Sequence, residues 1–224
     1  MPKTNADVAR ELARLSSDCS FLLTHLVRQN DGRSDKEAKS ILASILSIGR
    51  KPSRPLLKCS NVGWYSSASG SLIYNPESGK LDNNWDTKAV CFTESTLAGL
   101  RAHRDVFCVK YGVAFDRDWL FKKGANPCLN IHESLIRADV LIKGERYSRH
   151  TYNFVPANLL PFVNVIHESF DATHEREWRF AGNLPFKYSD VIFVFCPEAD
   201  FPLFSRIQLN GKPVFFDLAW LDRV

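Results

Sequence analysis

Long apolar runs and paired cysteines are both scarce in this chain of 224 residues. The longest apolar run near the C-terminus covers residues 191–196. A membrane-spanning helix needs about 20 such residues, so this run predicts a buried strand. None of the six cysteines belongs to a C-x-x-C pair, which argues against a disulfide framework or a zinc ribbon. The polar first residues lack the apolar stretch of a signal peptide. We therefore expect a cytoplasmic protein without a membrane partner.

The common catalytic and nucleotide-binding motifs are also missing. The chain has no G-x-G-x-x-G, no Walker loop, no H-E-x-x-H and no G-x-S-x-G. Their absence argues against the corresponding nucleotide sites, a zinc protease and an α/β-hydrolase. His132-Glu133 and His167-Glu168 each lack a second histidine at ligand spacing, so we predict no metal site.

The composition is that of an ordinary folded protein, with 45% hydrophobic and 24% charged residues. We expect one domain over residues 1–224. The net charge of +4 comes from scattered basic residues and only weakly favours an acidic partner.

Strands follow one another in the sequence, and the helices concentrate in the first half, which predicts an α+β fold. The expected helices cover residues 1–18, 34–49, 96–103 and 156–169. The expected strands cover residues 20–27, 89–93, 106–115, 175–180, 189–196 and 213–218. Residues 50–86 read as a long loop insertion with one hairpin around Ile73-Tyr74, and a loop of that length is usually functional or mobile. The polar residues 143–151 separate the neighbouring elements.

Single residues predict where several of these elements begin and end. Ser34, followed by Glu37, indicates a capping box, and Gly49 a helix end. Asp116 is suited to cap a short helical turn. Gly112, in the middle of the expected strand 106–115, indicates a bulge or a close approach by another group.

The acidic pair Glu175 and Glu177 is the most informative site candidate. Two residues apart on a strand, their carboxylates would share one face, roughly 7 Å apart. Arg179 continues the row and would neutralise one of them. On spacing alone, a solvated edge strand with weak surface ion pairs is the favoured interpretation.

Four further residues are binding candidates, each with a structural alternative. His25 ends the strand-like run Phe21-Leu-Leu-Thr-His25, where a neutral imidazole either bonds to backbone or donates to a ribose hydroxyl or a phosphate. Thr93 and Ser95 follow an expected strand, and helix capping by Ser95 is the stronger interpretation. Tyr111 lies in a strand, where packing is the default.

Three segments taken together resemble a known family. They are Val90-Cys-Phe-Thr-Glu94, residues 111–127 with their Y-G-x-x-F…W…K-G-x-N-P series, and Glu175-Arg-Glu-Trp-Arg179. This series resembles the AbiGi family, named for abortive phage resistance, and a related bacterial family of unknown function that carries E-x-E-W-R. The resemblance covers roughly residues 20–200 and implies an antitoxin or sensor component.

The same order of elements resembles the ADP-ribosyltransferase fold, closest in plan to DarT-like toxins. That resemblance implies a split, mixed β-sheet core with flanking helices that binds NAD⁺. His25 would contact the nicotinamide ribose, Thr93 or Ser95 would support the pocket, and Tyr111 is one candidate for stacking on nicotinamide. Glu177 would bind the ribose 2′-hydroxyl and stabilise an oxocarbenium-like transition state. Glu175 would activate the acceptor.

Three function classes stay open at this point. The first is an NAD-dependent mono-ADP-ribosyltransferase that modifies a nucleic acid or a protein in anti-phage defence. The second is a non-catalytic antitoxin or sensor of a toxin–antitoxin system, with a cognate toxin or antitoxin as partner and residues 175–179 as a structural ion-pair ladder. The third, a nucleic-acid-binding module, depends only on the mild positive charge and on Trp64, Tyr65 and Trp85.

Overall fold

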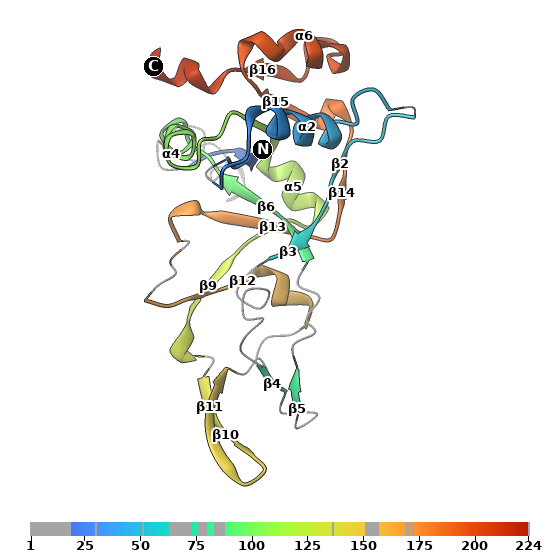
Figure 1. The fold of residues 1–224 in the computed structure, drawn as a ribbon. Coiled ribbons are helices and arrows are strands. Elements are labelled where there is room, and N and C mark those ends of the chain that lie inside the picture. Colours follow the sequence, from blue (N-terminus) through green and yellow to red (C-terminus); the bar gives the residue numbers. More distant parts are fainter. Residues whose placement is uncertain are drawn as a thin grey trace, which may run out of the picture. The chain divides into compact units, whose positions relative to one another are not determined.

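The fold is described from a computed structural model of the chain (Figure 1). The structure describes residues 19–29, 31–50, 52–62, 73–75, 80–82, 88–135, 137–150, 157–168, 171 and 173–223. The helix predicted over residues 1–18 and the aromatic residues Trp64, Tyr65 and Trp85 lie outside the described residues.

Contacts between Cα atoms divide the chain into two compact units. Unit 1 comprises residues 1–58, 92–125 and 183–224, and unit 2 comprises residues 59–91 and 126–182. Both are assembled from separate stretches of sequence, and the single-domain prediction stays a prediction. None of the helices in the described part of the chain is long and apolar enough to cross a membrane.

Unit 1 is built on a mixed, mostly antiparallel sheet with the strand order β16-β15-β7-β1-β6. Strand β1 (Leu22–Val27) pairs antiparallel with β7 (Tyr111–Asp116) and with the end of β6 (Lys88–Glu94). On its other side β7 pairs antiparallel with β15 (Val191–Phe195), which runs parallel to β16 (Val214–Phe216). This arrangement confirms the α+β class. An ADP-ribosyltransferase type of core stays a prediction.

Among the described residues of unit 1, four α-helices and a two-stranded pairing accompany this sheet. Helices α2 (Asp35–Ile45), α4 (Leu97–Phe107) and α5 (Arg117–Lys123) precede or follow its strands, and α6 (Phe201–Phe204) is a single short turn near the C-terminus. Strand β2 (Leu56–Leu57) pairs antiparallel with β14 (Leu184–Pro185). Short 3₁₀ helices complete the unit, at Tyr188–Asp190, Glu198–Asp200, Ser205–Ile207 and Leu218–Arg223.

The sequence signals for the ends of α2 and α5 are confirmed except at one position. Ser34 and Glu37 form the predicted capping box, and the Asp116 carboxylate accepts a hydrogen bond from the amide of Trp119 at the start of α5. The prediction that Gly49 ends α2 was wrong, because the helix ends at Ile45, with Leu46 as its C-cap. Gly49, at a φ of +76°, belongs to the turn that follows.

The strand predicted over residues 106–115 begins later than expected. Its first two residues, Val106 and Phe107, finish helix α4, and Cys108 ends this helix in the left-handed region at a φ of 51°. The buried positions Leu100 and His103 show the helical spacing. Because Val106 and Phe107 are both apolar, the sequence favoured a buried strand at these two residues. In the structure, Val106 is 66% exposed.

Unit 2 combines short pairings with two hairpins. In the sheet order, β13 (Glu177–Ala181) lies between β6 and β8 (Asn126–Pro127), and β3 (Ser60–Asn61) pairs with the start of β6. Strand β9 (Leu129–His132) runs parallel to β12 (Val163–Ile166). The hairpins are β4 (Ile73–Asn75) with β5 (Lys80–Asp82), as predicted around Ile73-Tyr74, and β10 (Arg137–Ile142) with β11 (Glu145–His150).

Two predictions in unit 2 were wrong. The polar residues 143–151 are not only a linker between elements. Lys143 and Gly144 form a two-residue turn with positive φ values, and strand β11 follows. The helix predicted over 156–169 is a 3₁₀ helix at Ala157–Phe162 followed by β12. Pro161 cannot continue an α-helix, and Val163, Val165 and Ile166 favour a strand. Further 3₁₀ helices lie at Glu133–Leu135 and Thr173–Glu175.

Candidate functional site

A buried ion pair on β13 is the centre of the polar site in unit 2. Glu177 and Arg179 lie two residues apart on this strand and therefore project from the same face. Nε of Arg179 lies 2.9 Å from Oε1 of Glu177, and Nη2 lies 2.9 Å from Oε2. The two side chains are only 3% and 10% exposed. The predicted neutralisation by Arg179 is confirmed, but the interpretation as a solvated edge strand was wrong.

Asn164, on strand β12 of unit 2, completes the network. Its side-chain amide donates to Oε2 of Glu177 at 2.9 Å, and its Oδ1 accepts from Nη2 of Arg179. Nη1 of Arg179 also donates to the carbonyl oxygens of Pro161, at 2.9 Å, and Val163, at 3.4 Å. The guanidinium group therefore joins β13 to the chain between residues 161 and 164.

The charges of this pair stabilise each other despite their burial. Burial is the largest single influence on the Glu177 carboxyl and by itself raises its pKa. Hydrogen bonds and the positive charge of Arg179, together with the Asn164 amide, outweigh burial and hold this pKa below its usual value. Burial likewise opposes the charge of Arg179, yet the pairing with Glu177 raises the pKa of the guanidinium. Both groups are thus charged at neutral pH.

Two cysteine thiols also face the Glu177 carboxylate. The pKa of Cys91 is raised well above its usual value by burial and by the charge and hydrogen bond of Glu177. Burial, opposed by the charge of Arg179 and aided by Glu177, raises the pKa of Cys128 to about 12. Because the thiolate is the reactive form, both thiols stay protonated and act as weak hydrogen-bond donors to the carboxylate.

The lone pairs of the Glu177 carboxylate are therefore occupied by hydrogen bonds from within the protein. Donors from Arg179, Asn164, Cys91 and Cys128 converge on it, whereas an ionised carboxylate offers about four lone-pair sites. A carboxylate that binds a ribose hydroxyl needs a free lone pair aimed at that hydroxyl. The geometry favours a structural role for Glu177.

Glu175 does not share the strand with Glu177, which corrects the prediction of two carboxylates on one strand face. Glu175 ends the 3₁₀ helix Thr173–Glu175, and β13 begins only at Glu177. Between them, Arg176 has a φ of 44°, in the left-handed region. This reversal breaks the alternation of a strand, so the spacing argument does not apply to the two carboxylates.

His25 lies within β1 in unit 1, not at the end of its strand as the sequence indicated. Its Cα is paired with that of Val113, and β1 continues to Val27. The imidazole is half-buried, and its ring meets that of Phe92 edge to face at 6.0 Å.

Thr93 and Ser95 form part of a buried hydroxyl cluster in unit 1. Ser95 does not cap α4, because Thr96 is the N-cap and its side chain accepts from the amide of Gly99. The Ser95 hydroxyl instead lies 2.7 Å from that of Thr24 and bonds to the carbonyl oxygen of Thr93. Thr24 bonds to this carbonyl as well. The cluster satisfies buried polar groups where β1 meets the end of β6.

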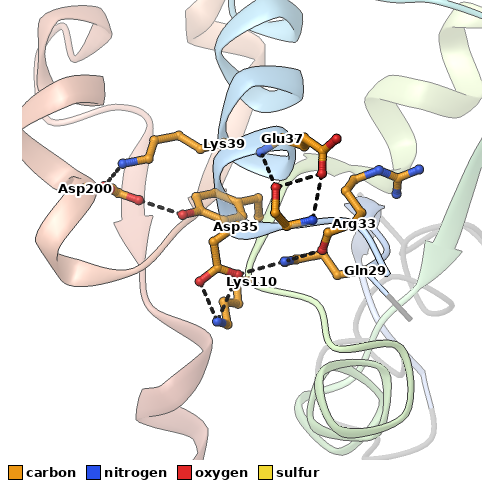
Figure 2. A network of polar contacts seen from close by, with 9 residues as sticks. Gln29, Arg33, Asp35, Glu37, Lys39, Lys110 and Asp200 are labelled. Carbon is orange, nitrogen blue, oxygen red and sulfur yellow. Dashed lines mark hydrogen bonds and ion pairs between the residues drawn. The ribbon is translucent and has the colours of Figure 1, made fainter. Parts of the chain in front are cut away.

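Tyr111 belongs to a network of charged groups in unit 1, of which Figure 2 labels Lys39 and Asp200. Its hydroxyl donates to Asp200 Oδ2 at 2.7 Å, and Asp200 also pairs with Lys39. Burial, with the neighbouring carboxylate of Asp200, raises the pKa of Tyr111 well above its usual value. The ring is 2% exposed. Tyr111 therefore fastens β7 to the segment around Asp200.

A second branch of the same network surrounds the start of α2. Lys110 Nζ lies 2.7 Å from Asp35 Oδ2, and the amide of Gln29 donates to Asp35 Oδ1 at 2.8 Å. Hydrogen bonds from Lys110 and Gln29 lower the pKa of Asp35, and the one from Lys110 has the larger effect. These contacts fix the first turn of the helix.

The predicted site residues fall into two groups. His25, Thr93, Ser95 and Tyr111 belong to unit 1, whereas Glu175 and Glu177 belong to unit 2. NAD⁺ binding by the whole set stays a prediction. Across the described residues, no three histidine, cysteine or acidic side chains gather as metal ligands would.

Sequence reasoning missed Asn164, Cys91 and Cys128 as parts of the site. A signal existed for Asn164, since it interrupts an otherwise apolar run, Val163–Ile166, and is only 1% exposed. A buried polar residue in such a run needs a hydrogen-bonding partner. The cysteines gave no comparable signal, because a buried thiol is usually a small apolar filler.

The comparisons with known proteins identify a defence-related family. Residues 83–195, half of the chain, match the family described as "Putative abortive phage resistance protein AbiGi, antitoxin". The chain belongs to this AbiGi family, and the matched residues include Cys91, Cys128, Asn164, Glu177 and Arg179. No curated protein and no solved structure matches the chain.

Proposed function

We propose that this protein is the antitoxin of an abortive infection system and that it binds and neutralises a toxin without catalysing a reaction. The match of residues 83–195 to a family described as an antitoxin is the observation that carries the proposal. This function corresponds to the second of the three classes that the sequence left open.

The pairing of the Glu177 carboxylate with Arg179 supports a non-catalytic role. In the transferase hypothesis, this carboxylate has to bind a ribose hydroxyl and stabilise positive charge on the sugar. Both of its oxygens instead bind Arg179, and Asn164 adds a further hydrogen bond. A bidentate guanidinium already compensates the negative charge that the reaction would need. The ion pair thus fits the structural ladder of the antitoxin hypothesis.

The charge of the chain fits binding to an acidic protein. A net charge of +4 favours encounters with partners of negative charge. We therefore expect the toxin to present an acidic surface to this protein.

Co-expression with the product of the adjacent gene tests the proposal. That gene product alone is expected to arrest growth, and adding this protein should restore colony counts to those of cells that carry neither gene. Colony counts that stay low, with both proteins present in the cell, would contradict the antitoxin function. Growth arrest by this protein alone, accompanied by transfer of label from NAD⁺, would favour the transferase instead.

A further inference from the structure

A pocket in unit 1 has the construction of a recognition site. It has a volume of about 420 Å³, within the range of roughly 300–1,000 Å³ that is typical of ligand pockets. Its lining comes from two stretches of chain, residues 53–55 and 185–188. Both stretches belong to unit 1.

Backbone pairing holds the two sides of the pocket together. Strands β2 and β14 pair antiparallel, and the amide of Phe186 donates to the carbonyl oxygen of Pro55 at 3.3 Å. Pro55 and Phe186 are buried. The Phe186 ring also packs edge to face on Phe115 of the sheet, at 5.1 Å. The apolar part of the pocket is therefore pre-formed.

Tyr188 forms a fixed aromatic wall. Its hydroxyl donates to the carbonyl oxygen of Leu46 at 2.7 Å. Because the hydroxyl has a single proton, the contact with Ser53 is one in which the Ser53 hydroxyl donates to Tyr188. The ring is half-buried, so one side of it remains available to a ligand.

Two positive charges border this apolar pocket. Arg54 and Lys187 are exposed and line it, and no acidic side chain of the described residues does. Neither the Arg54 guanidinium nor the Lys187 ammonium forms an ion pair with any of the described residues. The nearby Asp190 carboxylate accepts from the backbone amide of Lys187 at 2.8 Å. The two cations thus remain available to an anionic group.

We infer that this pocket binds an acidic segment of the toxin, one that inserts an apolar side chain between Phe186 and Tyr188 and places carboxylates beside Arg54 and Lys187. The inference rests on the proposed antitoxin function and names its contact surface. An apolar anchor seated in a pocket, with charges around it, is the usual construction of an interaction hot spot. Charge complementarity selects an acidic partner, because neither cation at the rim pairs with an acidic side chain in the described part of the chain.

Charge reversal in the full-length protein tests this inference. The variant R54E/K187E changes two exposed side chains of the pocket, and K36E/K122E changes two exposed lysines outside it. Both variants lower the net charge from +4 to 0, so they differ only in where the charge is removed. Calorimetric titration with the adjacent-gene product gives the dissociation constant of each. Circular dichroism checks that each variant is folded.

We expect R54E/K187E to weaken binding at least about tenfold, which corresponds to about 1.4 kcal/mol, and K36E/K122E to change it much less. Raising the salt concentration should weaken wild-type binding more than that of R54E/K187E, because the screened contacts are already lost in this variant. Equal affinities of wild type and R54E/K187E would overturn the inference and leave the antitoxin function standing. No binding by the wild type would overturn both.

Discussion

Arg179→Met is expected to lower the free energy of unfolding by about 3–5 kcal/mol, because it leaves the Glu177 carboxylate buried without its counter-charge. Only 10% of the Glu177 side chain is exposed, so water cannot replace the guanidinium. The carbonyl oxygens of Pro161 and Val163 also lose their donor. Urea unfolding, followed by circular dichroism, measures the change.

The double variant Glu177→Leu/Arg179→Met is the matched control. It removes both charges, and an apolar replacement of a whole buried pair is often tolerated. We expect this variant to be more stable than Arg179→Met alone, although Asn164 then loses its partners. If the double variant were the less stable of the two, the loss in Arg179→Met would come from packing and not from an uncompensated charge.

Gly112→Ala is expected to destabilise unit 1 by about 1–3 kcal/mol, the usual cost of forcing extra atoms into a packed interior. A Cβ atom at Gly112 would lie 2.7 Å from the carbonyl oxygen of His25 and 2.9 Å from Cδ2 of Leu26. The oxygen belongs to the backbone of β1, which is held between β7 and β6. The strand cannot withdraw without losing its own pairing. Thermal unfolding of the purified variant measures the effect.

Gly99→Ala serves as the control for this substitution. Gly99 lies in the first turn of α4, and the nearest atom to an added Cβ is the side-chain oxygen of Thr96, at 3.4 Å. Alanine is the better helix former, by roughly 0.5–1 kcal/mol in a helix interior. We expect this variant to be as stable as the wild type or slightly more so. Equal losses at both positions would show that the close approach at Gly112 is not the cause.

The sequence was most informative where one local interaction determines the structure. The capping box of Ser34 and Glu37 and the cap at Asp116 depend on residues within three positions of each other. The close approach at Gly112, predicted from a lone glycine in a strand, is confirmed by the distance to β1. The two caps follow from local chemistry that any fold has to respect, whereas the glycine predicted a close approach but not that β1 makes it.

The candidate site was harder to predict, because its geometry depends on distant residues. The pairing of Arg179 with Glu177 follows from strand spacing, but its burial depends on Asn164, Pro161 and Val163 from another segment. The prediction that Glu175 lies on the same strand as Glu177 failed for a local reason. The single left-handed residue Arg176 interrupts the alternation of the strand. Nothing in the composition of residues 173–180 marks that reversal.

The growth assay with Glu177→Gln tests most directly whether Glu177 serves only as a structural partner of Arg179 within the proposed antitoxin. Glutamine keeps the shape of the side chain and removes its charge, so the variant should unfold more easily while retaining the binding surface. At a temperature where its circular dichroism spectrum equals that of the wild type, we predict that it restores the growth of toxin-expressing cells as fully as the wild type does. A folded Glu177→Gln protein, equally abundant in the cell, that failed to restore growth would contradict a purely structural role of Glu177.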